Sequence, residues 1–264
     1  MTLHELKDLI GKSPETTIVF SDVHGYVELL ERAMDELEIR RETPHGKRTV
    51  RVGSIGDLID GRSDGDARTL EFAKQELDFV IAGNHEVALM GGPSFAGQPS
   101  SDKQGLGPVL YELAYAGILK AALGASGVLL THAGVNASYS LQNAELTAEL
   151  LNKQWEEYLV SPKVRSRMLR QPAALLAPSP LRSGGSLSDL KNQASPGCLW
   201  QSWEELLINY PKSFRQIIGH SPRGRIESSQ DEVLTNIDVA GYRVGIAVIT
   251  KGGQIVLGSD FFQI

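Results

Sequence analysis

The sequence is poor in cysteine, with Cys198 as the single one among 264 residues. One thiol cannot form an internal disulfide, and it excludes a metal cluster held by several thiolates. The chain also lacks any run of about 18 apolar residues, so no segment is expected to span a membrane. Its first residues, MTLHELKDLIGK, are charged and amphipathic and lack the apolar core of a signal peptide. We therefore expect a soluble, cytoplasmic protein with no membrane partner.

Positive charge is also scarce. The chain has 26 Lys and Arg against 32 Asp and Glu, which gives a formal net charge of -6. Proteins that bind nucleic acid through its backbone need a basic surface, so nucleic acid is not an expected partner. Apolar residues make up 41% of the chain. That fraction suffices for one large domain with a sizeable core, or for a domain that carries an insertion.

Strand and helix patterns alternate over the first third of the chain. The segments 16–21, 49–57 and 77–83 are apolar and read as strands, while 26–37 and 66–76 have helical spacing. This alternation predicts an α/β domain with neighbouring parallel strands. Later segments predict a helix at 108–123 and strands at 127–134, 214–221, 232–240, 243–250 and 253–259. The short turns between the last strands favour antiparallel hairpins.

Residues 136–197 differ from the rest of the chain. The part 136–170 is polar and helical, and the part 171–197 is rich in Pro, Ser and Gly. The helical part contains an apolar set including Ala148, Leu151, Trp155 and Leu159. We expect a single domain spanning 1–264, in which 136–197 is a helical and irregular cap insertion that selects the substrate. The alternative is a solvated surface excursion.

Polar side chains follow the predicted strands at the points where they end. Four of the 6 histidines do so, and two aspartates and one asparagine occupy the same kind of position. They are Asp22, His24, Asp57, Asn84, His85, His132 and His220. Ligand sites of open α/β sheets form outside the carboxyl ends of the strands, so these side chains can converge on one cleft. A single histidine after a strand is usually a surface residue, but coincidence at five strand ends is a poor explanation.

The donor types favour a metal site. Aspartate, histidine and asparagine suit Mn²⁺, Fe or Zn²⁺ rather than soft metals. Asp22 and His24 are two positions apart, so in an extended chain their side chains point the same way. One carboxylate, such as that of Asp57, can bridge two ions held about 3.5–4 Å apart.

Five motifs, taken in order, resemble the calcineurin-like metallophosphoesterases: DVHG (22–25), GDLID (56–60), GNHE (83–86), THAGV (131–135) and GHSP (219–222). GNHE and HAGV are similar to the phosphoprotein phosphatase branch, which includes bacterial serine/threonine phosphatases and diadenosine tetraphosphatases. Pro222 stands where many members of the wider superfamily have a second histidine, which this branch also lacks. The resemblance covers roughly 15–135 and 199–258. It implies an α/β (α+β sandwich) fold of two packed mixed β-sheets flanked by helices.

The resemblance also implies a pair of divalent ions, with Mn²⁺ expected and Fe or Zn²⁺ as alternatives. The first ion would be held by Asp22, His24 and Asp57. The second would be held by Asp57, Asn84, His132 and His220. His85 would have no ligand role and would protonate the leaving oxygen, oriented by Asp60. Glu86 would cap the helix that follows, where its charge favours the N-terminus.

The phosphate-binding arginines are less clear from the motifs. The family usually has Asp-Arg-Gly where this chain has Asp60-Gly61-Arg62. Arg62 therefore either reaches the phosphate from one position later or is a solvated charge. A second phosphate arginine is expected between His132 and His220 or just beyond. The candidates are Arg165, Arg167, Arg170, Arg182, Arg215 and Arg223.

These roles imply hydrolysis of phosphomonoesters by direct attack of a metal-bound hydroxide, most naturally by a protein serine/threonine phosphatase. The partner is then a phosphorylated substrate, either a phosphoprotein or a nucleotide, and the oligomeric state is left open. The GNHE motif favours the protein serine/threonine phosphatase. The THAGV motif favours the alternative, a diadenosine tetraphosphate hydrolase. A catalytically silent binding module is disfavoured, because buried unpaired Asp and His are costly without a metal.

Overall fold

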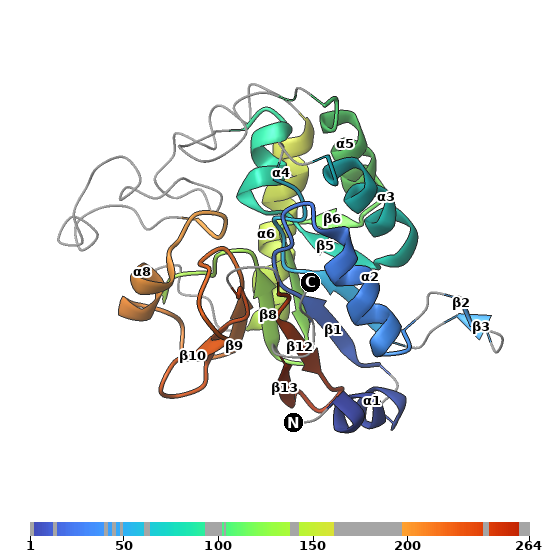
Figure 1. Ribbon diagram of the computed structural model, residues 1–264. Helices are drawn as coiled ribbons and strands as arrows, with labels where there is room; N and C mark the ends of the chain where they lie inside the picture. The colour runs from blue at the N-terminus through green and yellow to red at the C-terminus, as the bar shows by residue number, and fades with distance from the viewer. Residues whose placement is uncertain are drawn as a thin grey trace.

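Figure 1 shows the computed structural model of the chain. It describes residues 3–12, 15–39, 42–43, 46–47, 50–60, 64–92, 102, 104–137, 143–160, 197–239 and 243–258. Two β-sheets pack against each other, and helices cover their outer faces, which confirms the predicted α/β sandwich. The helices are α1 (Leu3–Lys12), α2 (Val27–Glu36), α3 (Asp66–Glu76), α4 (Asn84–Leu89), α5 (Gly107–Tyr115), α6 (Ala144–Val160) and α8 (Trp203–Ile208).

The larger sheet has six strands in the order β13-β12-β1-β4-β5-β6. They are β1 (Thr17–Phe20), β4 (Arg51–Ser54), β5 (Phe79–Ile81), β6 (Leu119–Lys120), β12 (Ile246–Ile249) and β13 (Ile255–Gly258). The strands β1, β4, β5 and β6 run parallel, as the sequence predicts for the first three. Their carboxyl ends therefore lie at one edge of the sheet.

The second sheet has five strands in the order β10-β11-β9-β8-β7. They are β7 (Ala122–Ala125), β8 (Val128–Thr131), β9 (Arg215–Ile218), β10 (Glu227–Ser228) and β11 (Leu234–Asn236). A separate pair, β2 (Glu42–Thr43) and β3 (Gly46–Lys47), forms an antiparallel ribbon. Because β8 and β9 are parallel neighbours, the residues that follow them also emerge side by side.

The side chains of each buried strand point alternately to the two faces of its sheet, and both faces contribute to the core. Val19 of β1 faces the other sheet, where it joins a cluster with Leu130 of β8 and Ile217 of β9. Its neighbours Ile18 and Phe20 point to the opposite side and pack in the cluster that includes the helices. Successive side chains of a strand point to opposite faces, so one apolar run serves both layers.

Helix α6 anchors the described part of the predicted insertion. It packs on β7 and β8, and its predicted apolar set is buried. The Trp155 indole donates a hydrogen bond to the Leu119 carbonyl at 3.2 Å, and the Asn152 side chain exchanges hydrogen bonds with the Ala122 backbone. Residues 161–196 lie outside the described residues, so the substrate-selecting cap stays a prediction.

One prediction about elements is wrong, and another is confirmed only in part. The predicted helix 108–123 ends at Tyr115, because Gly117 adopts a left-handed φ of 73° and the chain then enters the edge strand β6. The predicted antiparallel hairpins of the late strands are confirmed only for β10 with β11 and for β12 with β13. The strands β9 and β11 are parallel, and β12 belongs to the other sheet, where it pairs with β1 and β13. Within the described residues, no helix is both long and apolar enough to cross a membrane.

Candidate metal centre

The predicted ligands all follow strand ends, as the sequence indicates. Asp22 and His24 follow β1, Asp57 follows β4, and Asn84 opens α4 after β5. His132 and His220 follow β8 and β9 of the other sheet. All six are buried except His24, which is partly exposed. The two sheets thus bring these residues together at one edge of the sandwich.

The backbone at three of these positions is unusual. His24, Asp57 and His220 have φ values of 47°, 44° and 67°, in the left-handed region that few non-glycine residues adopt. Such conformations cost of order 1–3 kcal/mol each and persist only where the surroundings over-determine them. The packing of the fold therefore holds these three side chains in their positions.

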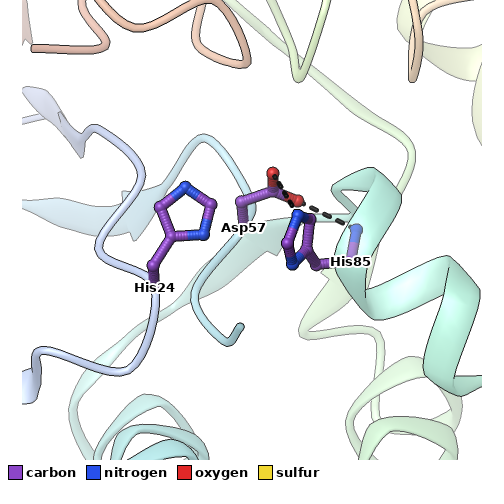
Figure 2. Close-up of side chains that lie close together, drawn as sticks. All are labelled: His24, Asp57 and His85. Atoms are coloured by element: carbon purple, nitrogen blue, oxygen red, sulfur yellow. Dashed lines mark hydrogen bonds and ion pairs between the residues drawn. The ribbon is translucent and has the colours of Figure 1, made fainter. Parts of the chain in front are cut away.

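The first group of donors surrounds Asp57. His24, Asp57 and His85 each offer an atom within 4.8 Å of the others. Figure 2 shows the Asp57 carboxylate directed toward His85, whose backbone N–H donates to Asp57 Oδ1 at 3.0 Å. His85 Nε2 lies 3.9 Å from Asp57 Oδ2. Asp22 follows β1 of the same sheet, and its Oδ2 accepts the backbone N–H of His220, which follows β9 of the second sheet, at 3.0 Å.

The second group also includes Asp57. His132 Nε2 lies 2.9 Å from Asn84 Oδ1, 3.1 Å from His220 Nδ1 and 3.4 Å from Asp57 Oδ2. Its other ring nitrogen, Nδ1, lies 3.1 Å from the Ile55 carbonyl oxygen. A carbonyl can only accept, so this contact fixes the proton on Nδ1 and directs Nε2 toward the other donors.

The residues present fit a pair of cations. Asp22 Oδ1 and His24 Nδ1 are buried without a hydrogen-bond partner, a costly arrangement unless another ligand satisfies them. Aspartate, histidine and asparagine are donors for Mn²⁺, Fe or Zn²⁺, as the sequence predicts. Asp57 belongs to both groups of donors, which is the placement that a bridging carboxylate requires.

The electrostatics of the site also favour positive charge. Burial alone would lower the pKa of His132, but the Asp57 carboxylate outweighs it and raises the pKa to about 10. Burial alone would raise the pKa of Asp57, but the imidazoles around it, His132 first, hold it well below its ordinary value.

The pKa of Asp22 is raised by burial and then by Asp238. Asp238 is a buried carboxyl two residues after β11, and burial together with Asp57 raises its pKa to about 7. Sequence reasoning assigned no role to Asp238.

The predicted acid, His85, faces two carboxylates. Its Nδ1 lies 3.5 Å from Asp60 Oδ1, within ion-pair reach but longer than a hydrogen bond. Catalytic hydrogen bonds are often long without substrate and tighten when it binds. The ring nitrogen of His85 that lies nearest Asp57 is Nε2, so the geometry also permits His85 to be a metal ligand.

Glu86 does cap α4, as predicted, and it does more. Its carboxylate accepts the Gly83 N–H at 2.8 Å. It also accepts the N–H groups of Asp57 at 3.0 Å and Ile59 at 3.3 Å, in the loop after β4. Burial, and then Asp57, raise the pKa of Glu86 to about 7. Glu86 therefore ties the turn that carries Asn84 to the loop that carries Asp57.

The predicted phosphate-binding arginines are only partly placed. Arg62 lies outside the described residues, as do the candidates Arg165, Arg167, Arg170 and Arg182. Arg215 opens β9, at the end of the strand opposite His220, and donates to the Gly253 carbonyl. Arg223 pairs with Glu204. The structure thus separates Arg215 from the metal centre.

Gly219 leaves room for Asp22. A Cβ atom at Gly219 would lie 2.1 Å from Asp22 Oδ1 and 2.7 Å from Ile55 Cγ2. Gly219→Ala should therefore displace the Asp22 carboxylate and weaken metal affinity by roughly 10–100-fold, the usual effect of disturbing the support of a ligand. Metal titration followed by calorimetry measures this change. Gly224→Ala is the matched control, because nothing lies within 4 Å of a Cβ atom there. Equal affinities for both variants would contradict the position assigned to Asp22.

Comparisons with known proteins bear on the fold and the family of the chain. None of the curated proteins matches the sequence. Among solved structures, a candidate diadenosine tetraphosphatase is similar, with a TM-score of 0.51 and 18% identity over 94% of this chain and 95% of that chain. A cold-active protein-tyrosine phosphatase of a psychrophilic Shewanella species has a TM-score of 0.56 and 14% identity, with 96% and 84% covered. A protein serine/threonine phosphatase from Saccharomyces cerevisiae has a TM-score of 0.52 and 12% identity, with 99% and 88% covered.

At such identities these likenesses show the fold alone. The family model for calcineurin-like phosphoesterases matches residues 16–224, which is most of the chain and includes each of the five motifs. The ordered motifs, the two mixed sheets and the family match lead to the same conclusion: the chain belongs to the calcineurin-like phosphoesterase family.

Proposed function

We propose that this phosphoesterase is a phosphatase that uses two divalent ions to hydrolyse phosphomonoesters, and that its substrates are proteins phosphorylated on serine or threonine. The observation that carries the proposal is the convergence of six donor residues, one of which, Asp57, belongs to both groups of donors. Such a constellation suits in-line displacement at phosphorus, where both the attacking and the leaving oxygen need stabilisation.

The ligand roles follow the two groups of donors. Asp22, His24 and Asp57 would hold one ion, and Asp57, Asn84, His132 and His220 the other, with Mn²⁺ the expected metal. When bound, the ions neutralise the charge on the phosphoryl oxygens and activate the attacking water. The Ile55 carbonyl keeps the ring of His132 in the orientation that presents Nε2. Glu86 holds the loop that presents Asp57.

The proton for the leaving oxygen comes from His85. Asp60 contacts Nδ1 of the ring and orients it, so Nε2 is the nitrogen that faces the centre and transfers the proton. General acid catalysis of this kind contributes typically 10²–10⁴-fold, most for leaving groups that are poor without a proton.

The second candidate is hydrolysis of diadenosine tetraphosphate or a related dinucleotide. The THAGV motif and the structural likeness to a candidate diadenosine tetraphosphatase favour it. Both candidates can use the same pair of ions, but they differ in the bond cleaved, a phosphate ester or a phosphoanhydride, and in what surrounds the phosphate. The insertion 136–197, whose helix α6 is fixed on the sheet, is the segment we expect to select between them.

A comparison of substrate classes tests the proposal. The purified, Mn²⁺-loaded protein should turn over phosphoserine and phosphothreonine peptides with a kcat/KM at least ten-fold above that for dinucleoside polyphosphates. Ten-fold corresponds to about 1.4 kcal/mol of differential transition-state binding. A small aryl phosphate serves as the control, because it needs only the metal centre. The reverse preference would support the dinucleotide hydrolase, and lack of turnover of all three would contradict a phosphatase.

A further inference from the structure

Asp66 is a buried carboxylate that none of the roles above includes. It is the first residue of α3, and its side chain is inaccessible to solvent, with a relative exposure of 0%. Its Oδ1 accepts the backbone N–H of Asp60 at 2.9 Å. Helix α3 is itself fixed in the core through Leu70 and Ala73, so Asp66 projects from a rigid element.

This hydrogen bond reaches a residue of the proposed acid pair. The Asp60 side chain contacts His85 Nδ1 at 3.5 Å, and the loop before Asp60 is held by Glu86 through the Ile59 N–H. Two buried carboxylates thus hold consecutive backbone N–H groups of this loop, Glu86 that of Ile59 and Asp66 that of Asp60. The direction of the Asp60 side chain follows from where its backbone is held, and an error of about 1 Å in a catalytic group can cost 10²-fold.

The hydrogen bond made by Asp66 differs from ordinary helix capping. Ser202 shows the ordinary form, since it is the N-cap of α8 and its hydroxyl accepts the N–H of Glu205 at 3.3 Å. Asp66 instead bonds to the backbone six positions before it, outside its own helix. The geometry points to Asp66 as a positioning residue, which holds Asp60 so that its carboxylate orients the His85 ring for proton transfer. This inference rests on the proposed function.

The test compares three variants across phosphate esters whose leaving groups differ in pKa. Asp66→Ala removes the acceptor, and Asp66→Asn keeps an oxygen that can accept the same N–H. Asp102→Ala removes a carboxylate that accepts the N–H groups of Leu106 and Gly107 at the start of α5, away from the site. We expect Asp66→Ala to lose roughly ten-fold in kcat on an alkyl phosphate and less than two-fold on 4-nitrophenyl phosphate, whose leaving group departs without a proton. Bound Mn²⁺ per chain and KM should stay unchanged.

The controls distinguish positioning from loss of fold. Asp66→Asn should recover most of the kcat on the alkyl ester, and Asp102→Ala should lower the melting temperature without altering the dependence on the leaving group. An equal loss on both esters, or an Asn variant as impaired on the alkyl ester as the Ala variant, would overturn the inference and leave the phosphatase intact. A wild-type protein that turns over neither ester would contradict the proposed function, and the role of Asp66 with it.

Discussion

Replacing Asp57 with asparagine should lower kcat on an aryl phosphate by roughly 10³-fold or more and leave the chain with fewer than two ions. Asp57 is the one residue that belongs to both groups of donors, and its charge balances His132 and His85. Asparagine keeps the size of the side chain but loses the charge that can bridge two cations. Metal centres supply several kcal/mol of transition-state stabilisation, and each 1.4 kcal/mol is a factor of ten. Elemental analysis and steady-state kinetics measure both effects.

The control for this variant is Asp64→Asn, which changes an exposed aspartate in the turn before α3 and should leave kcat unchanged. The wild-type protein treated with a chelator should lose activity as the Asp57 variant does, and Mn²⁺ should restore it. An Asp57 variant with two ions and full activity would contradict the shared-carboxylate arrangement.

Replacing His85 with asparagine should keep about two metals per chain and lower kcat by roughly 10²–10⁴-fold on esters with poor leaving groups. The loss on activated aryl esters should be much smaller, because their leaving group departs without a proton. This expectation follows from the contact between His85 Nδ1 and Asp60, which leaves Nε2 directed at the centre. A series of esters assayed with one metal-loaded preparation gives the dependence on the leaving group.

The same variant distinguishes the two roles that the geometry permits for His85. His85 lies close enough to His24 and Asp57 to complete a metal site with them. If His85→Asn loses one ion, and all esters are affected alike, His85 is a ligand and the acid has to be sought elsewhere. His24→Asn provides the comparison, since it should lose metal in either case.

The placement of the candidate ligands was predictable because it depends on local rules. Strand ends are visible in the sequence as apolar segments that stop at polar residues, and parallel strands send their ends to one edge. Asp22, Asp57 and Asn84 each satisfy that rule within a few residues, and the structure places them accordingly. The strand pairing of the late segments was not predictable in this way, because it depends on partners that are distant in the chain.

The residues that sequence reasoning missed share a different property. Asp66 and Asp238 bear on the site through burial and through contacts made by the folded backbone, and neither residue follows a predicted strand end in a motif. The predicted helix 108–123 was too long for a related reason, since Leu119 and Ala122 suit a helix or a short strand equally. Pairing of β6 with β5 and of β7 with β8 places these two residues in strands.

The hydrogen bond from His220 to Asp22 joins positions that are 198 residues apart. Strand β1, which precedes Asp22, is itself sandwiched between β4 and β12, and β12 comes from near the end of the described chain. Contacts of such high sequence separation form slowly, because the chain loses the conformational entropy of closing a long loop before the contact can stabilise it. A nascent chain still on the ribosome has Asp22 and His24 exposed long before His132 and His220 have been synthesised. We therefore expect Asp22 and His24 to bind ions only weakly during synthesis. Metal selectivity is then determined by the folded protein and not by the growing chain.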